Sequence, residues 1–131
     1  IQLGRFITGH LYLTAEVNGT NATFVLDTGA GSTVMEEKKE SKFNLTTSLS
    51  ESKAVGAGGN NLALKETSIK NFCIKNYVLH DYKIHLMNLD HVNNAFKKVG
   101  IAEIDGVIGA DILIRGKAVI DYEKLILYLK K

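Results

Sequence analysis

The sequence predicts a mostly β fold, and two observations carry that prediction. Short apolar segments, several of them alternating with polar residues, recur along the chain and are separated by turn-forming residues, which is typical of β-sheet proteins. The 131 residues include 45% hydrophobic and 23% charged side chains, an ordinary composition for a globular protein with one core. No linker or internal repeat divides the chain, so we expect residues 1–131 to form a single domain.

The first two predicted strands form a hairpin that leads to an aspartate. His10–Val17 alternates apolar and polar residues, and Ala22–Leu26 is rich in β-forming residues. Asn18-Gly19 lies between them and is a typical two-residue hairpin turn. The second strand runs directly into Asp27, and small residues at 29–32 then end regular structure.

The middle of the chain is predicted to hold one charged helix and a meander of short strands. Met35–Phe43 is rich in charged helix formers, which indicates a short solvent-exposed helix. Ala54–Asn60 is dense in glycine between β-forming residues, which is typical of a mobile hairpin tip. The meander is expected at Leu62–Ile69, Phe72–Ile74, Tyr77–Leu79 and Lys83–Met87, with bends at Lys75-Asn76 and His80-Asp81.

The C-terminal part combines an amphipathic helix, a buried strand and a closing hairpin. Apolar residues within 89–99 recur at spacings of three and four, which predicts a helix that ends at Gly100. Asp105–Leu113 indicates an apolar strand that runs into a short helix. Lys117–Tyr122 and Leu125–Leu129 predict a last hairpin across Glu123-Lys124.

Composition and charge exclude several classes of function. The net charge of +2 comes with scattered lysines, which do not form the concentrated basic face that nucleic acid binding requires. No segment approaches the ~20 apolar residues of a membrane span. The histidines lack metal-ligand spacing with cysteines or acids, so we predict no metal and no cofactor. The lone Cys73 lies in an apolar stretch and is expected to pack as a small hydrophobic residue.

Three segments stand in an order that points to one family. They are an apolar strand ending in Asp27-Thr28-Gly29-Ala30, a glycine-rich segment at 55–59, and Gly106–Leu113 before the short helix. With the closing hairpin they span nearly the whole chain, and in this order they resemble the retropepsin-like (retroviral-type) aspartic proteases and their bacterial single-domain relatives. The resemblance implies a closed β-barrel of the acid protease fold, with one amphipathic helix and one short C-terminal helix.

Asp27 is the candidate catalytic residue. Peptide hydrolysis of this type needs one ionised carboxylate to activate water and one protonated carboxyl to polarise the carbonyl group. Two adjacent carboxyls share a proton because both cannot ionise at modest cost. The chain has one Asp-Thr-Gly, and neither Asp105 nor Asp111 is followed by the same turn. The second Asp27 is therefore expected from a second copy in a homodimer, while a strand-end carboxylate that caps a turn is the alternative.

The resemblance implies roles for the neighbours of Asp27. Thr28 would hydrogen-bond across the two-fold axis, Gly29 would let the backbone approach dyad and substrate, and Ala30 would line the cleft floor. Asp111 would cap or anchor the short helix. The substrate-binding flap would comprise Val55, Gly56, Ala57, Gly58 and Gly59, with an ordinary flexible hairpin as the alternative.

These features predict an aspartic endopeptidase that acts on an extended peptide or protein substrate. A catalytically silent peptide-binding or scaffolding module of the same fold is the alternative, and a regulatory domain released from a longer precursor is a third reading. The apolar run Leu125–Leu129 suits either a strand shared between subunits or a core strand. The chain begins at Ile1 without an export signal, so we expect a soluble domain that is either cytoplasmic or exported after signal removal.

Overall fold

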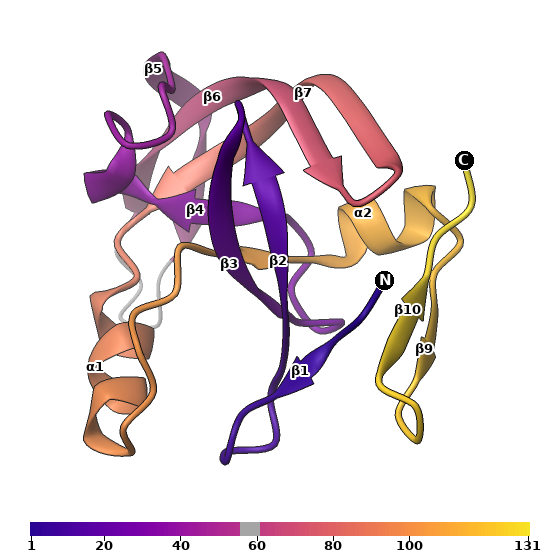
Figure 1. The fold of residues 1–131 in the computed structure, drawn as a ribbon. Coiled ribbons are helices and arrows are strands. Elements are labelled where there is room, and N and C mark those ends of the chain that lie inside the picture. The colour runs from indigo at the N-terminus through magenta and orange to yellow at the C-terminus, as the bar shows by residue number, and fades with distance from the viewer. Residues whose placement is uncertain (56–60) are drawn as a thin grey trace.

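The β-sheet of this protein closes on itself into a barrel (Figure 1). The computed structural model describes residues 1–55 and 61–131, and the side chains of 1–48 and 65–131. Within these residues, six strands pair in a ring: β2 (Leu11–Val17), β3 (Thr20–Leu26), β8 (Gly106–Ile108), β4 (Val34–Glu36), β7 (Tyr77–Met87) and β6 (Asn61–Ile74), which returns to β2. Two more strands, β1 (Gly4–Arg5) and β5 (Thr47–Val55), extend the sheet from β2 and β6. The predicted mostly β closed barrel is confirmed.

The hairpin of β2 and β3 forms as its sequence predicts. Val17 pairs with Thr20 across Asn18-Gly19, and the two turn residues have φ angles of 51° and 84°, as this kind of two-residue turn requires. Buried and exposed side chains alternate along β2. This alternation fixes the register, because a slip by one residue would turn the core face towards solvent. The hairpin therefore holds the end of β3 at a defined place in the barrel.

The three-residue strand β8 lies between β3 and β4. It pairs in parallel with β3 and antiparallel with β4. Gly106 permits this arrangement, because a Cβ there would lie 2.5 Å from the Val34 carbonyl oxygen and 2.6 Å from a ring carbon of Phe24. The buried strand predicted from the run that begins at Asp105 is thus confirmed, and it joins the C-terminal part of the chain to the first hairpin.

The helix predicted at Met35–Phe43 is wrong. Met35 and Glu36 belong to β4, and Glu37–Lys39 form only a single 3₁₀ turn, η1. Met35 is completely buried and pairs with Leu86 of β7. Pairing within the sheet and burial override the helical preference of this charged segment, since intrinsic helix propensity is weak compared with tertiary contacts.

The predicted meander of short strands is replaced by two long strands. β6 and β7 pair along nearly their whole lengths on either side of the turn at Lys75-Asn76. The second predicted bend, at His80-Asp81, is a local irregularity, because Asp81 has a φ of 51° while the pairing register is the same on both sides of it. Each of these strands has a partner on both edges, and this pairing carries the strand through residues of low β preference.

The two helices predicted in the C-terminal part are present, as α1 (Asp90–Lys98) and α2 (Ala110–Arg115). Gly100 follows α1 with a φ of 80°, which suits a glycine that ends a helix. The apolar face of α1 is narrower than predicted, because Phe96 is buried whereas Ala95 and Val99 are exposed. Neither helix is long and apolar enough to cross a membrane.

The closing hairpin pairs with the N-terminal segment, beside which it lies in Figure 1. β9 (Val119–Asp121) and β10 (Ile126–Tyr128) are antiparallel, as predicted. The Leu127 amide donates to the Ile1 carbonyl oxygen at 2.8 Å, and Leu127 is buried. β10 is therefore flanked on both edges, and in the single chain it is a core strand. Within the described residues, the uncovered edge of this small sheet belongs to β9.

Glu36 connects β4 to the start of α1 and carries a prediction for stability. Its side chain is buried, with Oε2 accepting from the Leu89 amide at 2.7 Å and Oε1 accepting from the Lys38 amide at 3.3 Å. Replacing Glu36 with Ala leaves the Leu89 amide without its acceptor, which costs about 1–3 kcal/mol in a buried setting. We expect Glu36→Ala to lower the free energy of unfolding by that amount, as measured by urea denaturation.

The matched control is Lys38→Ala. The Lys38 side chain forms an exposed ion pair with Asp90, and exposed pairs contribute little to stability. We expect its denaturation midpoint to stay near that of the wild type. An equal loss of stability in both variants would contradict the role assigned to the buried carboxylate.

Candidate active site

Asp27 lies immediately after β3 and opens a tight turn. Its amide donates to the Ile108 carbonyl oxygen at 3.0 Å, which continues the pairing of β3 with β8. Its carbonyl oxygen accepts from the Ala30 amide at 3.1 Å, and its side-chain Oδ1 accepts from the Gly29 amide at 2.9 Å. The side chain is exposed. Asp27 therefore caps its own turn with Oδ1, as the alternative interpretation proposed, and still presents its carboxylate to solvent.

The start of α2 is in direct backbone contact with this turn. The Ala110 amide donates to the Ala30 carbonyl oxygen at 2.7 Å. Gly109 is buried at the same contact, and a Cβ there would lie 2.7 Å from the Ala30 oxygen and 2.9 Å from the carbonyl group of Ser32. Only a residue without a side chain fits between the two backbones. The segment that precedes α2 thus supports the Asp27 turn by direct contact.

A chain of hydrogen bonds extends this support into the barrel. The fully buried Thr33 hydroxyl accepts from the Gly109 amide at 3.1 Å and lies 2.8 Å from Asp111 Oδ1, to which it donates. Asp111 Oδ2 accepts from the Tyr82 hydroxyl of β7, also at 2.8 Å. The side chain of Asp111 does not cap α2. It anchors the helix to Thr33 and Tyr82 instead, which agrees with the anchoring role expected for it.

A pocket of about 400 Å³ lies beside Asp27. Three parts of the chain meet there, namely the loop between β1 and β2, the end of β3, and the first strand of the closing hairpin. Among the described residues that line it, Asp27 is the only acid. The lining comprises Thr8, Gly9, His10, Leu11, Leu26, Asp27, Thr28, Ile120 and Tyr122.

The structure brings only some of the predicted site residues together. Asp27 and Thr28 line the pocket, and both are exposed. Gly29 and Ala30 belong to the same turn but do not line this pocket. Val55 ends β5 opposite Asn61 of β6, while Gly56, Ala57, Gly58 and Gly59 lie outside the described residues.

Other acids of the described chain are engaged elsewhere. Asp105 is buried, and its Oδ2 accepts from the Thr23 amide at 2.8 Å. Its Oδ1 forms an ion pair with the Lys39 ammonium group, which also contacts Glu103 at 2.8 Å.

In residues 1–55 and 61–131, no group of histidine, cysteine and acidic side chains has the arrangement of a metal site.

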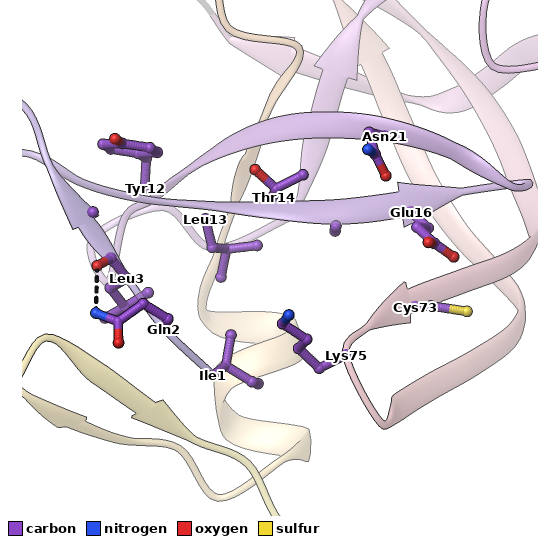
Figure 2. Close-up of a pocket in the computed structure, with 12 residues that line it drawn as sticks. Ile1, Gln2, Leu3, Tyr12, Leu13, Thr14, Glu16, Asn21, Cys73 and Lys75 are labelled. Carbon is purple, nitrogen blue, oxygen red and sulfur yellow. Dashed lines mark hydrogen bonds between the residues drawn. The ribbon is translucent and has the colours of Figure 1, made fainter.

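A second pocket, of about 550 Å³, lies away from Asp27 (Figure 2). It lies between the N-terminal segment, β2 and the end of β6, with Thr14 and Glu16 on one side and Lys75 on another. Cys73 is half-buried and is one of the residues that line it, so Cys73 is less enclosed than its apolar neighbours in the sequence suggested. None of the residues predicted for catalysis or substrate binding lines this pocket.

Sequence reasoning missed His10, Tyr122 and Tyr82. His10 lines the Asp27 pocket, with Nδ1 2.7 Å from the Thr8 hydroxyl and its ring edge against Phe96. Tyr122 comes from the closing hairpin, and Tyr82 reaches Asp111 from the middle of β7. Each is brought in by long-range strand pairing, for which the local sequence carries no signal.

The contact at Gly109 gives a testable prediction. A methyl group there collides with two backbone carbonyl groups that cannot move without displacing the Asp27 turn. Overpacking of this kind costs about 1–3 kcal/mol. We expect Gly109→Ala to lower the melting temperature and to shift the backbone NMR resonances of residues 27–33.

Gly31→Ala is the matched control, because nothing lies within 4 Å of a Cβ built at Gly31. We expect it to melt close to the wild type and to shift only the resonances of position 31 and its immediate neighbours, leaving those of Asp27 and Thr28 in place. If Gly109→Ala behaves like Gly31→Ala, the contact between α2 and the turn does not constrain Asp27.

Comparisons with known proteins agree with this architecture. The fold is similar to the crystal structure of a retropepsin-like aspartic protease from Rickettsia conorii, with a TM-score of 0.67 and 21% identity over 99% of this chain and 89% of the other. It is similar to the retroviral protease-like domain of Ddi1 from Leishmania major, with a TM-score of 0.63 and 14% identity over 92% and 87%. EIAV protease, solved with the inhibitor HBY-793, gives a TM-score of 0.61 and 16% identity over 85% and 91%.

A comparison with curated protein sequences finds no match. The family described as aspartyl protease matches residues 13–112, which include the Asp27 turn, β8 and the start of α2. That match covers most of the chain, and the solved structures share its fold. The chain therefore belongs to the aspartyl protease family and has the retropepsin-like fold.

Proposed function

We propose that this protein is an aspartic endopeptidase whose catalytic centre contains Asp27 from each of two copies of the chain. The observation that carries the proposal is the exposed Asp27 carboxylate, held at the end of β3 by a turn that α2 supports from behind. Such a turn positions a reactive group on rigid elements, as catalysis requires. Membership of the aspartyl protease family supports the same chemistry.

One chain supplies only half of the required centre. The mechanism needs a second carboxyl within a few ångströms, and in the described part of the chain no other acid lines the Asp27 pocket. Asp105 is committed to Lys39 and to the Thr23 amide, and both oxygens of Asp111 accept from hydroxyl groups. A two-fold axis beside Asp27 brings the same residue from a second copy and completes the pair.

The paired carboxyls then hold one proton between them. The ionised one accepts a proton from water as the water oxygen attacks the peptide carbonyl carbon, and the protonated one donates to the carbonyl oxygen. The resulting tetrahedral intermediate, which carries two hydroxyl groups, collapses when the protonated carboxyl gives its proton to the amide nitrogen and the C–N bond breaks. The other carboxylate accepts the proton of one hydroxyl as the carbonyl group re-forms, so the pair again holds one proton. We propose that Thr28 hydrogen-bonds across the two-fold axis to the turn of the partner. Gly29 would let the backbone approach the dyad and the substrate, Ala30 would line the floor of the cleft, and residues 55–59 would form the flap.

The surface around the Asp27 pocket suits contact with a second copy. Ile7, at the tip of the loop between β1 and β2, is 86% exposed, while Val119 and Tyr122 of the closing hairpin are 57% and 61% exposed. Apolar side chains gathered beside an unpaired strand edge favour association. Both segments border Asp27, so contact through them would bring two copies of Asp27 close to one axis.

The first functional prediction concerns Asp27. Asn keeps the shape of the side chain but neither accepts a proton from water nor shares one with its mate. We expect Asp27→Asn to lower kcat for cleavage of a peptide library by roughly 10²- to 10⁴-fold, the usual contribution of a general acid or base. Cleavage is followed by mass spectrometry from acidic to neutral pH.

The control is Asp81→Asn, on the exposed irregularity of β7, where the φ of 51° also suits Asn. It should cleave as the wild type does. Absence of cleavage by a wild-type dimer at every pH would favour the silent peptide-binding module, whereas activity in a strict monomer would exclude the shared dyad.

The second functional prediction concerns the dimer face. We expect Ile7→Lys to weaken self-association by roughly tenfold or more, because it places a charge in an apolar contact. Sedimentation velocity over a range of concentrations measures this change, and cleavage should fall in parallel at low protein concentration.

Ile114→Lys is the matched control, since Ile114 lies on α2 and is 75% exposed. It makes the same chemical change on α2, which contributes no residue to the lining of the Asp27 pocket, whereas the loop that carries Ile7 contributes several. If the two variants associate equally strongly, the loop between β1 and β2 is not part of the dimer interface.

A further inference from the structure

The side chain of Tyr82 connects the barrel wall to the start of α2. Tyr82 lies on β7, and its hydroxyl donates to Asp111 Oδ2 at 2.8 Å. The Arg115 guanidinium, one helical turn after Asp111, lies 5.7 Å from the centre of the Tyr82 ring. Two side chains on the same face of α2 therefore contact one tyrosine. This fixes the helix relative to β7.

The direction of each hydrogen bond in this chain follows from Asp111. An ionised carboxylate only accepts, so both the Thr33 and the Tyr82 hydroxyls donate to it. Because the single hydroxyl proton of Thr33 points to Asp111, its oxygen is free to accept from the Gly109 amide at 3.1 Å. All three hydrogen bonds can therefore form at the same time: Tyr82 and Thr33 donate to Asp111, and Gly109 donates to Thr33.

The chain continues to the catalytic turn. The amide next to Gly109, that of Ala110, donates to the Ala30 carbonyl oxygen, and the Ala30 amide donates to the Asp27 carbonyl oxygen. Burial, and then the hydrogen bond to Asp111, raise the pKa of Tyr82 above its ordinary value. Its hydroxyl accordingly stays protonated, and remains a donor, throughout the pH range of peptide hydrolysis.

We propose that Tyr82 and Asp111 are positioning residues that hold the Asp27 turn in its catalytic geometry through Thr33 and Gly109. The inference rests on the function proposed above for Asp27. Neither residue borders the Asp27 pocket, so they act on the turn and not on the substrate. Their loss should therefore lower kcat while leaving KM nearly unchanged, because the correct position of Asp27 matters most in the transition state.

The test is a double-mutant cycle of Tyr82→Phe and Asp111→Asn. We expect Tyr82→Phe to reduce kcat by about tenfold, the effect of one hydrogen bond to a charged group. Asp111→Asn should cost at least as much, because an amide offers one acceptor oxygen to two donating hydroxyls. In the double variant the Asn oxygen is free for Thr33. The fold reduction in kcat of the double variant should therefore be smaller than the product of the two single fold reductions.

Amide hydrogen exchange supplies a second readout that does not depend on activity. Exchange at Gly109 and Ala110 should speed up in both single variants, while amides of the hairpin of β2 and β3 keep wild-type rates. Tyr128→Phe, at an exposed position of β10, is the control for loss of a tyrosine hydroxyl and should change neither readout.

The outcomes separate this inference from the proposed function. Wild-type cleavage with unchanged kcat in Tyr82→Phe, or unchanged exchange at Gly109, overturns the positioning role and leaves the peptidase assignment standing. A wild type that cleaves nothing overturns the peptidase assignment and with it any catalytic role for Tyr82. Purely additive losses in the double variant would overturn the coupling through Asp111.

Discussion

The contact between the Gly109 backbone and the turn after Asp27 is the constraint on which the site depends. Two backbones meet there at a distance that excludes even a methyl group. The contact can form only because β8 is threaded between β3 and β4, which in turn requires Gly106. The barrel is thus organised around β8, in which Val107 and Ile108 lie between Gly106 and Gly109. Asp27 lies at the end of β3, where its amide donates to the carbonyl oxygen of Ile108.

Two buried acids, Glu36 and Asp105, and the half-buried Asp111 hold this arrangement together, and both oxygens of each have partners. Glu36 accepts from two backbone amides, Asp105 from a backbone amide and a lysine, and Asp111 from two hydroxyls. Burying a carboxylate without partners is costly, so these residues favour the one register in which all their bonds form. Asp27 differs, because its carboxylate is exposed and, within the described residues, only one of its oxygens accepts a hydrogen bond.

The sequence predicted those parts of the fold and the candidate site that depend on local pattern. The hairpin before Asp27, the strand and helix around Gly109 and the closing hairpin carry their own turn residues and periodicity. The helix prediction for Met35–Phe43 was wrong because the composition of the segment favours a helix, whereas Met35 pairs with Leu86 of β7 in the sheet. His10, Tyr122 and Tyr82 could not be found, because their positions depend on which strands pair, and pairing is decided by the whole barrel.

The catalytic pair proposed above would be assembled from two chains, so each chain would have to hold its own Asp27 in place. Productive geometry tolerates errors of only about half an ångström, and a two-fold axis duplicates any displacement of Asp27 in its mate. In the dimer proposed above, a substitution that relaxed the turn would act in both chains and would therefore displace both carboxyls. This makes rigid support behind Asp27 more important than in an enzyme with a single catalytic acid. The succession of contacts from β7 through α2 to the turn meets that demand within each chain, before any partner binds.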